Sequence, residues 1–460
     1  MHRNWLPQIE EPAAPPASLQ RRLLDALARD IGSGALAPGA RLPTHRDLAY
    51  RLGISVGTVT KVYAEAERRG LVASHVGRGT FVAGVREESR REGEPVDLAL
   101  NLPPASAATA ARLEAALARL RRGRDLAGLA QYPPPLGNER HRRAGAAWLD
   151  RHGCPGADWR DLMLTMGAQH AMSLALAALA RPGDTILVEA ATYHGVKSLA
   201  QHAGYRLRGI AMDAEGLRPD ALEEAARPGA VLYTLPSLQN PTARSMSRPR
   251  REAIAALAAR HALWIVEDDI CGALAQPDAP PPLAALLPER SFYVSSLSKT
   301  VMPGLRTGFL LLPRGDAAMR ERLARSVQAT AIAAPAFGPA IAAAWIEDGT
   351  ADAILAETRQ EAAARRRLAG DILGCAPPPD ASASLHLWLD LPELEAERVA
   401  GRALREGVAV TPTDAPIVDP RLISGLRICL GAAPDRASLA RGLRVIAAAL
   451  RAAPEGRLVF

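Results

Sequence analysis

Lysine is nearly missing from this chain of 460 residues, which carries it only at Lys61, Lys197 and Lys299. Arginine fills almost every other cationic position. Arginine replaces lysine well as a surface charge, but a guanidinium cannot condense with an aldehyde to form an imine, as a lysine amine can. A lysine that this sequence keeps is therefore a candidate for amine chemistry.

Cysteine and long apolar runs are also scarce. The four cysteines are widely spaced and form no Cys-x-x-Cys pair or ligand cluster, so we expect reduced, buried thiols and no metal site. No apolar run follows Met1, so we expect no signal peptide. The uncharged stretch 329–346 is interrupted by proline and glycine, which favours a buried segment over a membrane span. These absences predict a soluble, cytoplasmic protein with no membrane partner.

The positive charge is concentrated near the N-terminus. The length predicts two or three domains, and the net charge of the whole chain is +7. Residues 18–83 hold ten Lys or Arg and five Asp or Glu, which leaves +5 of that total in this segment. A basic segment of this size is typical of a partner for double-stranded DNA.

The same segment has the pattern of a winged helix-turn-helix. Ser18, Thr44 and Ser55 are good N-caps for three successive amphipathic helices. The short turn between the second and third helices predicts that the third enters a major groove. Residues 71–74 and 80–82 predict a two-stranded wing with Arg78 at its tip. The alternative is a three-helix packing module with a solvated basic face.

The stretch "GALAPGARLPTHRDLAYRLGISVGTVTKVYAEAERRGLVASHVGRGTFV" resembles the winged-helix domain of the GntR family of bacterial regulators. His45 stands where that family more often has serine. The resemblance implies that five residues touch DNA, namely Arg46, Thr58, Thr60, Lys61 and Arg78.

The pattern changes after a charged linker at residues 84–95. Apolar strands then alternate with Ala- and Leu-rich helices, which predicts an α/β fold with a mainly parallel sheet. We expect a large domain over residues 96–350 and a smaller α/β domain over 351–460. The winged helix-turn-helix domain would occupy residues 18–83.

Lys299 lies in the string Ser-Ser-Leu-Ser-Lys-Thr-Val-Met-Pro-Gly-Leu-Arg, which ends at Arg306. Serine hydroxyls and a guanidinium suit a phosphate, and the lysine suits an aldehyde, so the string predicts a Schiff base with pyridoxal phosphate (PLP). The alternative is a polar loop after a short strand. The string also resembles the Ser-x-Ser-Lys…Pro-Gly-x-Arg signature of fold-type I aminotransferases, which implies phosphate contacts for Ser296, Ser298 and Arg306.

Two further segments suit the same cofactor. Gly167 follows an apolar strand and precedes an apolar helix, and a helix N-terminus of this kind binds anions. Asp268 lies in the acidic string that ends another apolar strand, where open α/β sheets bind ligands. A carboxylate there would keep a pyridine nitrogen protonated. The alternative for the acidic string is a solvated strand end.

The aminotransferase resemblance extends over most of the remaining chain and assigns further roles. It implies that Ala168 and Gln169 hold the phosphate and that Asp268 meets the ring nitrogen. Tyr193 would stack on the ring, and Asn240 would bind its 3′-oxygen. Tyr132 would reach the phosphate of a neighbouring subunit. Arg427, inside an apolar strand, would bind a substrate α-carboxylate, or alternatively form an internal salt bridge.

The chain departs from the aminotransferase pattern at two places. Ala243 replaces a usual glycine after Asn240. Ile270 and Cys271 stand where the family usually has a tyrosine that hydrogen-bonds the cofactor. Loss of that phenol argues against efficient turnover.

The order of the two signatures resembles the MocR group of bacterial regulators. That resemblance implies a homodimeric transcription factor whose PLP aldimine at Lys299 senses a small amine, amino acid or vitamer. The alternative is a genuine PLP-dependent aminotransferase with a fused regulatory DNA-binding domain. A third hypothesis is that PLP only stabilises the dimer.

Overall fold

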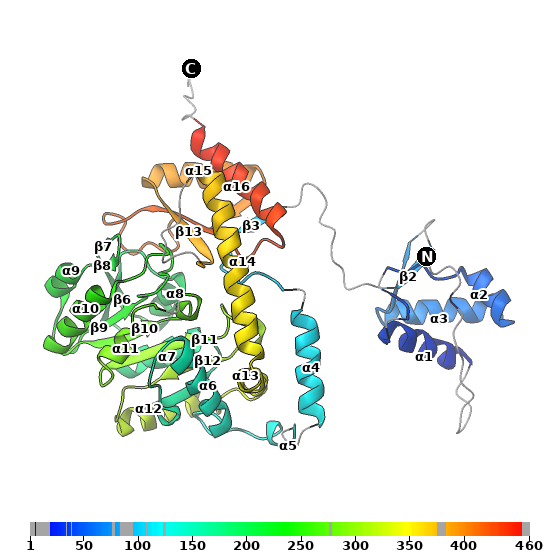
Figure 1. The fold of residues 1–460 in the computed structure, drawn as a ribbon, viewed down its shortest axis with the longest axis horizontal. Helices are drawn as coiled ribbons and strands as arrows, with labels where there is room; N and C mark the ends of the chain where they lie inside the picture. The colour runs from blue at the N-terminus through cyan, green and yellow to red at the C-terminus, as the bar shows by residue number, and fades with distance from the viewer. Residues whose placement is uncertain are drawn as a thin grey trace. The chain divides into compact units, whose positions relative to one another are not determined.

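The computed structural model of the chain describes residue 5 and residues 19–33, 35–37, 39–75, 79–82, 95–106, 108–122, 126–275, 278–374 and 383–452. The chain divides into two compact units, Met1–Glu94 and Pro95–Phe460 (Figure 1). Nearly all of the predicted linker lies outside the described residues.

The N-terminal unit is built on three helices, α1 (Leu19–Gly32), α2 (His45–Leu52) and α3 (Val56–Arg68). Thr44 Oγ1 accepts a hydrogen bond from the backbone N–H of Asp47 at 3.2 Å, and Ser55 Oγ accepts one from Thr58 at 3.1 Å. Because these side chains satisfy N–H groups that a helix start leaves free, α2 and α3 begin where the sequence predicts. Leucines and valines from all three helices form one buried core.

A two-stranded antiparallel hairpin follows the helices. Its strands are β1 (Val72–His75) and β2 (Gly79–Val82), with Val72 opposite Val82. Val72 and Val82 are buried in the helical core, so the hairpin packs against the helices as a wing. Arg78 lies outside the described residues.

The second unit contains a seven-stranded sheet in the order β4-β12-β11-β10-β9-β5-β6. Strand β12 runs antiparallel to both of its neighbours, and the other neighbouring pairs are parallel. This confirms the predicted α/β fold with a mainly parallel sheet. In chain order the strands are β4 (Leu162–Thr165), β5 (Thr185–Glu189), β6 (Arg206–Ile210), β9 (Val231–Thr234), β10 (Trp264–Asp268), β11 (Ser291–Ser296) and β12 (Gly308–Leu311).

Helices cover both faces of this sheet, which explains why its strands read as continuous apolar runs. Phe292 and Val294 of β11 pack into one core with residues of two helices, α7 (Ala168–Leu179) and α12 (Ala317–Thr330). Tyr293, which points to the opposite face, packs into another core with residues of α6 (Glu139–His152) and α13 (Phe337–Glu347). The alternation follows from the two-residue period of a strand.

The second unit contains further helices and turns. The helices are α5 (Leu126–Leu129), α8 (His194–Ala203), α9 (Pro219–Ala225), α10 (Arg248–Arg260) and α11 (Leu283–Leu286). Three are 3₁₀ turns, namely η1 (Trp159–Asp161), η2 (Gly272–Leu274) and η3 (Pro303–Leu305).

The C-terminal part of this unit forms a second layer. The long helix α14 (Thr350–Leu373) leads into the antiparallel pair β13 (His386–Asp390) and β15 (Gly425–Cys429). Two helices, α15 (Glu393–Arg405) and α16 (Arg436–Arg451), pack with this pair. Figure 1 shows α14, α15 and α16 gathered on this side of the sheet domain, and α4 (Thr109–Arg122) beside α13.

The first strand after the linker also joins this layer. Strand β3 (Val96–Leu98) pairs in parallel with β14 (Val408–Val410). Val96 and Leu98 are buried in the core that α15, α16 and β15 form. The segment that opens the predicted large domain therefore packs with the C-terminal layer.

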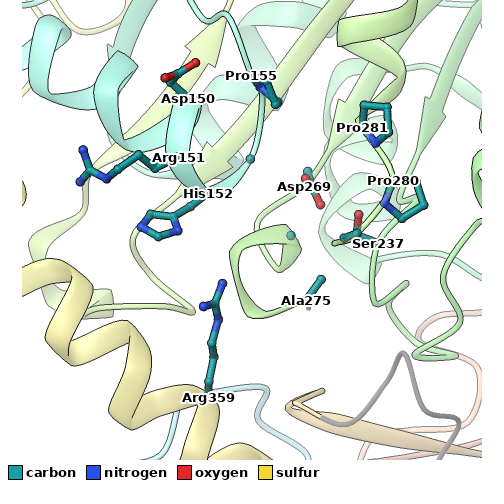
Figure 2. Close-up of a pocket in the computed structure, with 13 residues that line it drawn as sticks. Asp150, Arg151, His152, Pro155, Ser237, Asp269, Ala275, Pro280, Pro281 and Arg359 are labelled. Atoms are coloured by element: carbon teal, nitrogen blue, oxygen red, sulfur yellow. The ribbon is translucent and has the colours of Figure 1, made fainter. Parts of the chain in front are cut away.

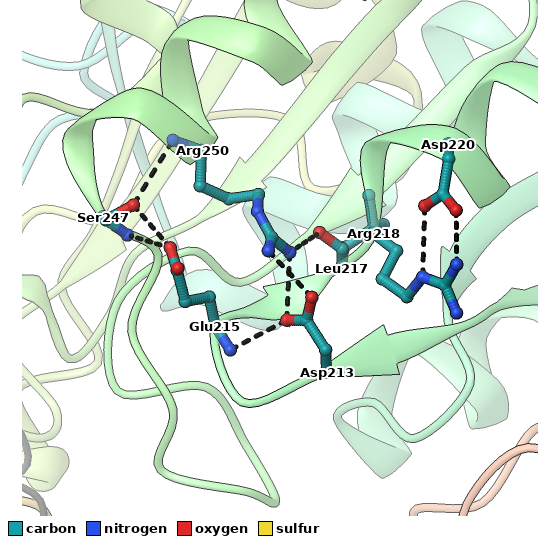
Figure 3. Close-up of polar contacts among 7 residues, drawn as sticks. All are labelled: Asp213, Glu215, Leu217, Arg218, Asp220, Ser247 and Arg250. Atoms are coloured by element: carbon teal, nitrogen blue, oxygen red, sulfur yellow. Dashed lines mark hydrogen bonds and ion pairs between the residues drawn. The ribbon is translucent and has the colours of Figure 1, made fainter.

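An arginine fixes the start of α10, which follows the loop that carries Asn240 (Figure 3). Arg250 donates two hydrogen bonds to the Asp213 carboxylate, at 3.0 and 2.8 Å, and one to the Leu217 carbonyl at 2.9 Å. Asp213 and Leu217 belong to the hairpin of β7 (Met212–Asp213) and β8 (Gly216–Leu217). The guanidinium holds the pKa of Asp213 below its usual range.

Among the described helices, none combines the length and the apolar character that a bilayer crossing requires.

Candidate functional site

Three neighbouring parallel strands, β9, β10 and β11, bring the predicted site residues to one edge of the sheet. Asp268 is the last residue of β10, and Ser296 is the last residue of β11, with Lys299 three positions further. The loop after β9 carries Asn240. Because the carboxyl ends of parallel strands meet at the same edge, the structure gathers these residues where α/β folds bind ligands.

Lys299 has a half-buried side chain at this edge. Its Nζ donates a hydrogen bond to the backbone carbonyl of Asn101. Burial lowers the pKa of Lys299 below its usual value, and the nearby positive charge of Arg427 acts in the same direction. A lowered pKa increases the share of neutral amine, which is the form that attacks an aldehyde.

Asp268 is fully enclosed and has one satisfied oxygen. The Tyr233 hydroxyl donates to Asp268 Oδ2 at 2.6 Å, whereas Oδ1 is buried with no hydrogen-bond partner among the described residues. Burial raises the pKa of this carboxyl to about 7. An unsatisfied buried acceptor is costly, and a protonated ring nitrogen would satisfy it.

The whole acidic string at the end of β10 is buried, so it is not a solvated strand end. Glu267 accepts hydrogen bonds from the backbone N–H groups of Leu283 and Ala284 at the start of α11. Burial raises the pKa of Glu267 to about 7. Each acid therefore has its own surroundings, and Asp268 faces the predicted cofactor edge.

A cradle for an anion forms around Gly167, the N-cap of α7. Gly167 has φ +83°, and a Cβ there would lie 2.6 Å from Arg306 Nη2. Arg306 donates from the same nitrogen to the Met166 carbonyl at 2.9 Å. The first turn of α7, which begins with Ala168 and Gln169, presents its free N–H groups beside this guanidinium.

The serines of the lysine string lie on a neighbouring strand. Ser296 Oγ and Ser298 Oγ are 2.7 Å apart, and Ser296 is opposite Gly308 in the sheet. A Cβ on Gly308 would lie 2.5 Å from the backbone carbonyl carbon of Gly167. The close approach of Gly308 to Gly167 therefore brings the two serines near the Gly167 cradle.

Arg427 and Asn240 contact each other directly, although they come from different layers. Arg427 Nη1 donates to Asn240 Oδ1 at 2.6 Å, Nε donates to Thr411 Oγ1 at 2.9 Å, and Nη2 donates to the Ala99 carbonyl at 3.1 Å. Among the described residues no carboxylate pairs with Arg427. The salt-bridge alternative therefore has no support in the described contacts.

The loop that holds Asn240 contains an alanine in a backbone conformation that favours glycine. Ala243, which replaces the usual glycine of this loop, has φ +58°. This is the left-handed region that costs a residue with a Cβ about 1 kcal/mol or more. Its N–H donates to the Gln239 carbonyl at 2.6 Å, and the side chain of Asn240 is buried.

Tyr193 and Tyr132 differ in their surroundings. Tyr193 precedes α8 and is half-buried, and burial raises the pKa of its phenol, with the Asp268 charge adding to the effect. Gln169 Nε2 donates to the carbonyl of Gly195, two residues after Tyr193, at 2.9 Å. Tyr132 is 82% exposed, so within one subunit it contacts little.

Cys271 lies near Lys299, at one of the two positions where the family usually has tyrosine. Its thiol is buried, and burial raises its pKa to about 12, which keeps the thiol neutral. Ile270 packs against the large apolar core. Neither side chain supplies a phenol to this edge of the sheet.

Sequence reasoning missed two polar partners of the site, Tyr233 and His386. His386 Nε2 lies 3.0 Å from the Gln239 carbonyl, and burial lowers the pKa of this imidazole to about 3, which keeps it neutral. Each residue is a polar group within an apolar strand. A polar residue in an apolar strand was the sequence signal that could have identified them, because a buried polar group needs a hydrogen-bond partner.

Four of the five predicted DNA-contacting residues lie on α2 and α3, and Arg78 lies outside the described residues. Thr60 and Lys61 are exposed on this helix, and Arg46 is exposed at the start of α2. Thr58 is half-buried, and its hydroxyl lies 2.8 Å from that of Ser55. His45 Nδ1 lies 3.1 Å from Thr60 Oγ1, so the residue that replaces serine positions a threonine on α3.

Fold and site together define a two-part protein that joins a winged helix-turn-helix to an aminotransferase-like domain. Residues 93–446 match the family "Aminotransferase class I and II", and the chain belongs to this family. Residues 19–82 match "Bacterial regulatory proteins, gntR family", which identifies the N-terminal unit as a DNA-binding domain. This is the architecture of MocR-type regulators.

Curated relatives include HTH-type transcriptional regulators. The chain is 28% identical over 319 residues to the uncharacterized HTH-type transcriptional regulator YdeF of Bacillus subtilis, which covers 68% of each protein. It is 29% identical over 314 residues to the HTH-type pyridoxine biosynthesis transcriptional regulator PdxR of Corynebacterium glutamicum, covering 66% of this chain and 68% of that protein.

A solved structure supports the fold of the second unit. The α-aminoadipate aminotransferase LysN of Thermus thermophilus, complexed with N-(5′-phosphopyridoxyl)-L-leucine, superposes with a TM-score of 0.68 at 27% identity. The match covers 77% of this chain and 92% of that one. The winged helix-turn-helix unit is thus additional to a nearly complete aminotransferase domain.

Family membership implies PLP as the cofactor, and the residues present fit it. The unsatisfied Asp268 Oδ1 suits a protonated ring nitrogen. The Gly167 cradle, where no Cβ fits beside Arg306, suits a phosphate.

Proposed function

We propose that this protein is a PLP-dependent transcriptional regulator that senses a small amine, amino acid or vitamer at Lys299. The observation that carries the proposal is the unsatisfied Asp268 Oδ1, which lies on the same sheet edge as a lysine with a lowered pKa. The unit that carries these residues is fused to a helix-turn-helix domain. Because its partner is chromosomal DNA, the proposal also places the protein in the cytoplasm.

Each candidate residue has a distinct part in holding PLP. Lys299 would bind it covalently, and Asp268, supported by the Tyr233 hydroxyl, would hold the ring nitrogen protonated. Tyr193 would cover the ring face, and Asn240 would donate to the ring oxygen. The phosphate would be held by the first turn of α7 at Ala168 and Gln169, and by Ser296, Ser298 and Arg306.

In this proposal an incoming amine takes the place of the Lys299 amine on the cofactor. When bound, PLP supplies an aldehyde carbon that reacts reversibly with primary amines. The lowered pKa of Lys299 favours its release as a neutral amine, so an incoming amine can take its place. Arg427 would bind the carboxylate of an amino-acid effector bidentately.

Arg427 also offers a physical link between an effector and the packing of the two layers of the second unit. Its hydrogen bond to Asn240 joins the C-terminal layer to the loop after β9. An effector carboxylate would compete for the same guanidinium and so change the contact between the two layers. Such a differential contact is what a ligand needs in order to shift a conformational equilibrium.

A homodimer is part of the proposal. Tyr132 is exposed on its own subunit, as expected of a side chain that completes the phosphate site of a partner. Two DNA-binding units in one dimer would also match two half-sites of an operator.

The second candidate function is a genuine aminotransferase. The near-complete aminotransferase domain supports this function. Against it, Ile270 and Cys271 provide no phenol beside the cofactor. An assay for keto-acid production with a panel of amino donors separates the two functions. Sustained turnover would favour the enzyme, and a Cys271→Tyr variant that gains turnover would identify the missing group.

The cofactor claim is tested by the visible absorbance of the purified protein with PLP, before and after borohydride, for wild type and Lys299→Ala. We expect a band in the wild type that borohydride removes while fixing PLP on a peptide containing Lys299. The variant should lack both. Equal borohydride labelling of the variant would contradict the assignment.

A further inference from the structure

A second pocket is lined by Asp269, the chain neighbour of Asp268 (Figure 2). It has a cavity of about 110 Å³, enough for several water molecules or one small organic molecule. None of the residues assigned above to PLP, effector or DNA lines it. Its lining combines Asp269 and Ser237 with Arg359, His152 and two prolines, Pro280 and Pro281.

The floor of this pocket is a buried acceptor. Asp269 is 4% exposed, and its Oδ2 accepts a hydrogen bond from the Tyr293 hydroxyl at 2.7 Å. Oδ1 is buried without a hydrogen bond of ordinary geometry among the described residues. Ser237 lies beside it, and its hydroxyl oxygen accepts from Arg251 Nη2 at 3.0 Å. Burial raises the pKa of Asp269, and the positive charge of Arg251 opposes that rise. The floor therefore presents the Asp269 carboxylate, already beside one cation, to whatever enters.

The rim carries a cation that points inward. Arg359 extends from α14 into the pocket, and its Nε donates to the Ala273 carbonyl at 2.8 Å (Figure 2). Arg151 and His152, on the neighbouring side, are both bonded to Asp352. Arg359 itself forms no ion pair among the described residues, although the Asp352 charge acts on it, so its guanidinium can meet an anionic group.

We propose that this pocket is a binding site for a small zwitterion, with its ammonium on Asp269 and its carboxylate on Arg359. The acceptor floor and the cationic rim match the two ends of an α-amino acid. Pro280, Pro281 and Ala275 line the wall and offer apolar contacts to a short side chain. A ligand with only one charge would satisfy only one end.

The pocket is also coupled electrostatically to the cofactor edge, an inference that rests on the proposed function. Burial raises the pKa of Asp268, and the negative charge of its neighbour Asp269 raises it further. An ammonium bound to Asp269 would oppose that effect. Asp268 would then be ionised more fully, and its hold on a protonated ring nitrogen would strengthen.

L-proline is a suitable probe, because its secondary amine cannot replace Lys299 as a neutral imine on PLP. Its binding to the full-length, PLP-loaded protein is measured by calorimetry. We expect saturable binding that weakens about tenfold or more in Asp269→Asn and in Arg359→Gln, since each removes a charge-assisted contact. Asp371→Asn and Arg367→Gln, exposed changes of the same type on α14, should bind as wild type does.

Two analogues separate the ends of the site. Cyclopentanecarboxylate lacks the amine and pyrrolidine lacks the carboxylate, so each should bind about tenfold more weakly than L-proline. Lys299→Ala should still bind L-proline, which keeps this test independent of the proposed function. The proposal is overturned by any of three results: no saturable binding, binding that survives Asp269→Asn in a folded variant, or binding that Lys299→Ala abolishes.

Discussion

Arg427 Nη1 donates a hydrogen bond to Asn240 Oδ1 over 2.6 Å, and both side chains are buried. The arginine comes from β15 in the C-terminal layer, and the asparagine comes from the loop after β9. One contact therefore joins the residue proposed to recognise an effector to a residue proposed to hold the cofactor. A ligand that engages Arg427 must act on this contact.

Replacing Arg427 should discriminate between effectors. We expect Arg427→Gln to weaken the binding of amino acids roughly ten- to hundredfold, because a charge-assisted contact to the carboxylate is lost. Simple alkylamines should bind with little change. The measurement is a spectral titration with an amino acid and with the amine of the same side chain. An equal loss for both ligands would contradict the carboxylate role.

Replacing Asp268 should weaken PLP more than removing its hydrogen-bond donor does. Asp268→Asn is expected to lower PLP affinity roughly ten- to hundredfold, since it removes the charge opposite the ring nitrogen. Tyr233→Phe, the control, leaves that charge and removes one neutral donor, so about a fivefold loss is expected. PLP fluorescence titration of both variants tests the order. A larger loss in Tyr233→Phe would place the ring nitrogen elsewhere.

His386 should make the protein less stable in acid. The pKa of this imidazole falls from 6.5 to about 3 on folding, so the unfolded chain binds a proton that the folded chain excludes. Stability is therefore lost as the pH falls below 6.5, by about 2 kcal/mol at pH 5. Asp268 and Glu267, whose pKa values rise to about 7, change stability in the opposite direction.

The His386 contribution is isolated by comparison with a variant. Urea unfolding of wild type and His386→Gln is measured at pH 7.5 and at pH 5. The difference in unfolding free energy between the two proteins should shrink by about 2 kcal/mol at the lower pH. A difference that does not depend on pH would show that His386 is readily protonated in the folded protein.

Lys61 should contribute to DNA binding through its positive charge. Lys61→Ala is expected to weaken DNA binding. It should also lower the magnitude of the slope of log K against log salt concentration by about one. Arg68→Ala is the matched control on the same helix, because Arg68 is already paired with Glu65 at 2.7 Å. Fluorescence anisotropy at several salt concentrations compares them. Equal salt slopes for Lys61→Ala and wild type would remove Lys61 from the interface.

Local patterns in the sequence predict much of this structure. Thr44 and Ser55 cap the helices that they were expected to cap, because a helix start depends on nearby side chains alone. Asp268 ends an apolar strand, and the parallel sheet then places it beside the lysine string. The resemblance to known families supplied the roles of the remaining candidates.

Partners that are distant in the sequence were not predictable in the same way. The pairing of β3 with β14 depends on how the whole second unit folds, and no local sequence period reveals it. Tyr233 and His386 are visible as polar residues in apolar strands, but their partners follow only from the assembled sheet. The Asp269 pocket requires four separate segments and has no signature in any of them.

The most direct test of the account is the effect of amines on DNA affinity. The DNA is selected from a random pool by wild-type protein loaded with PLP, and its affinity is measured with each of a panel of primary amines and amino acids. We predict that at least one primary amine changes the affinity of the wild type and leaves that of Lys299→Ala unchanged. The same change in both proteins, or no change in the wild type with any amine of the panel, would contradict sensing at Lys299.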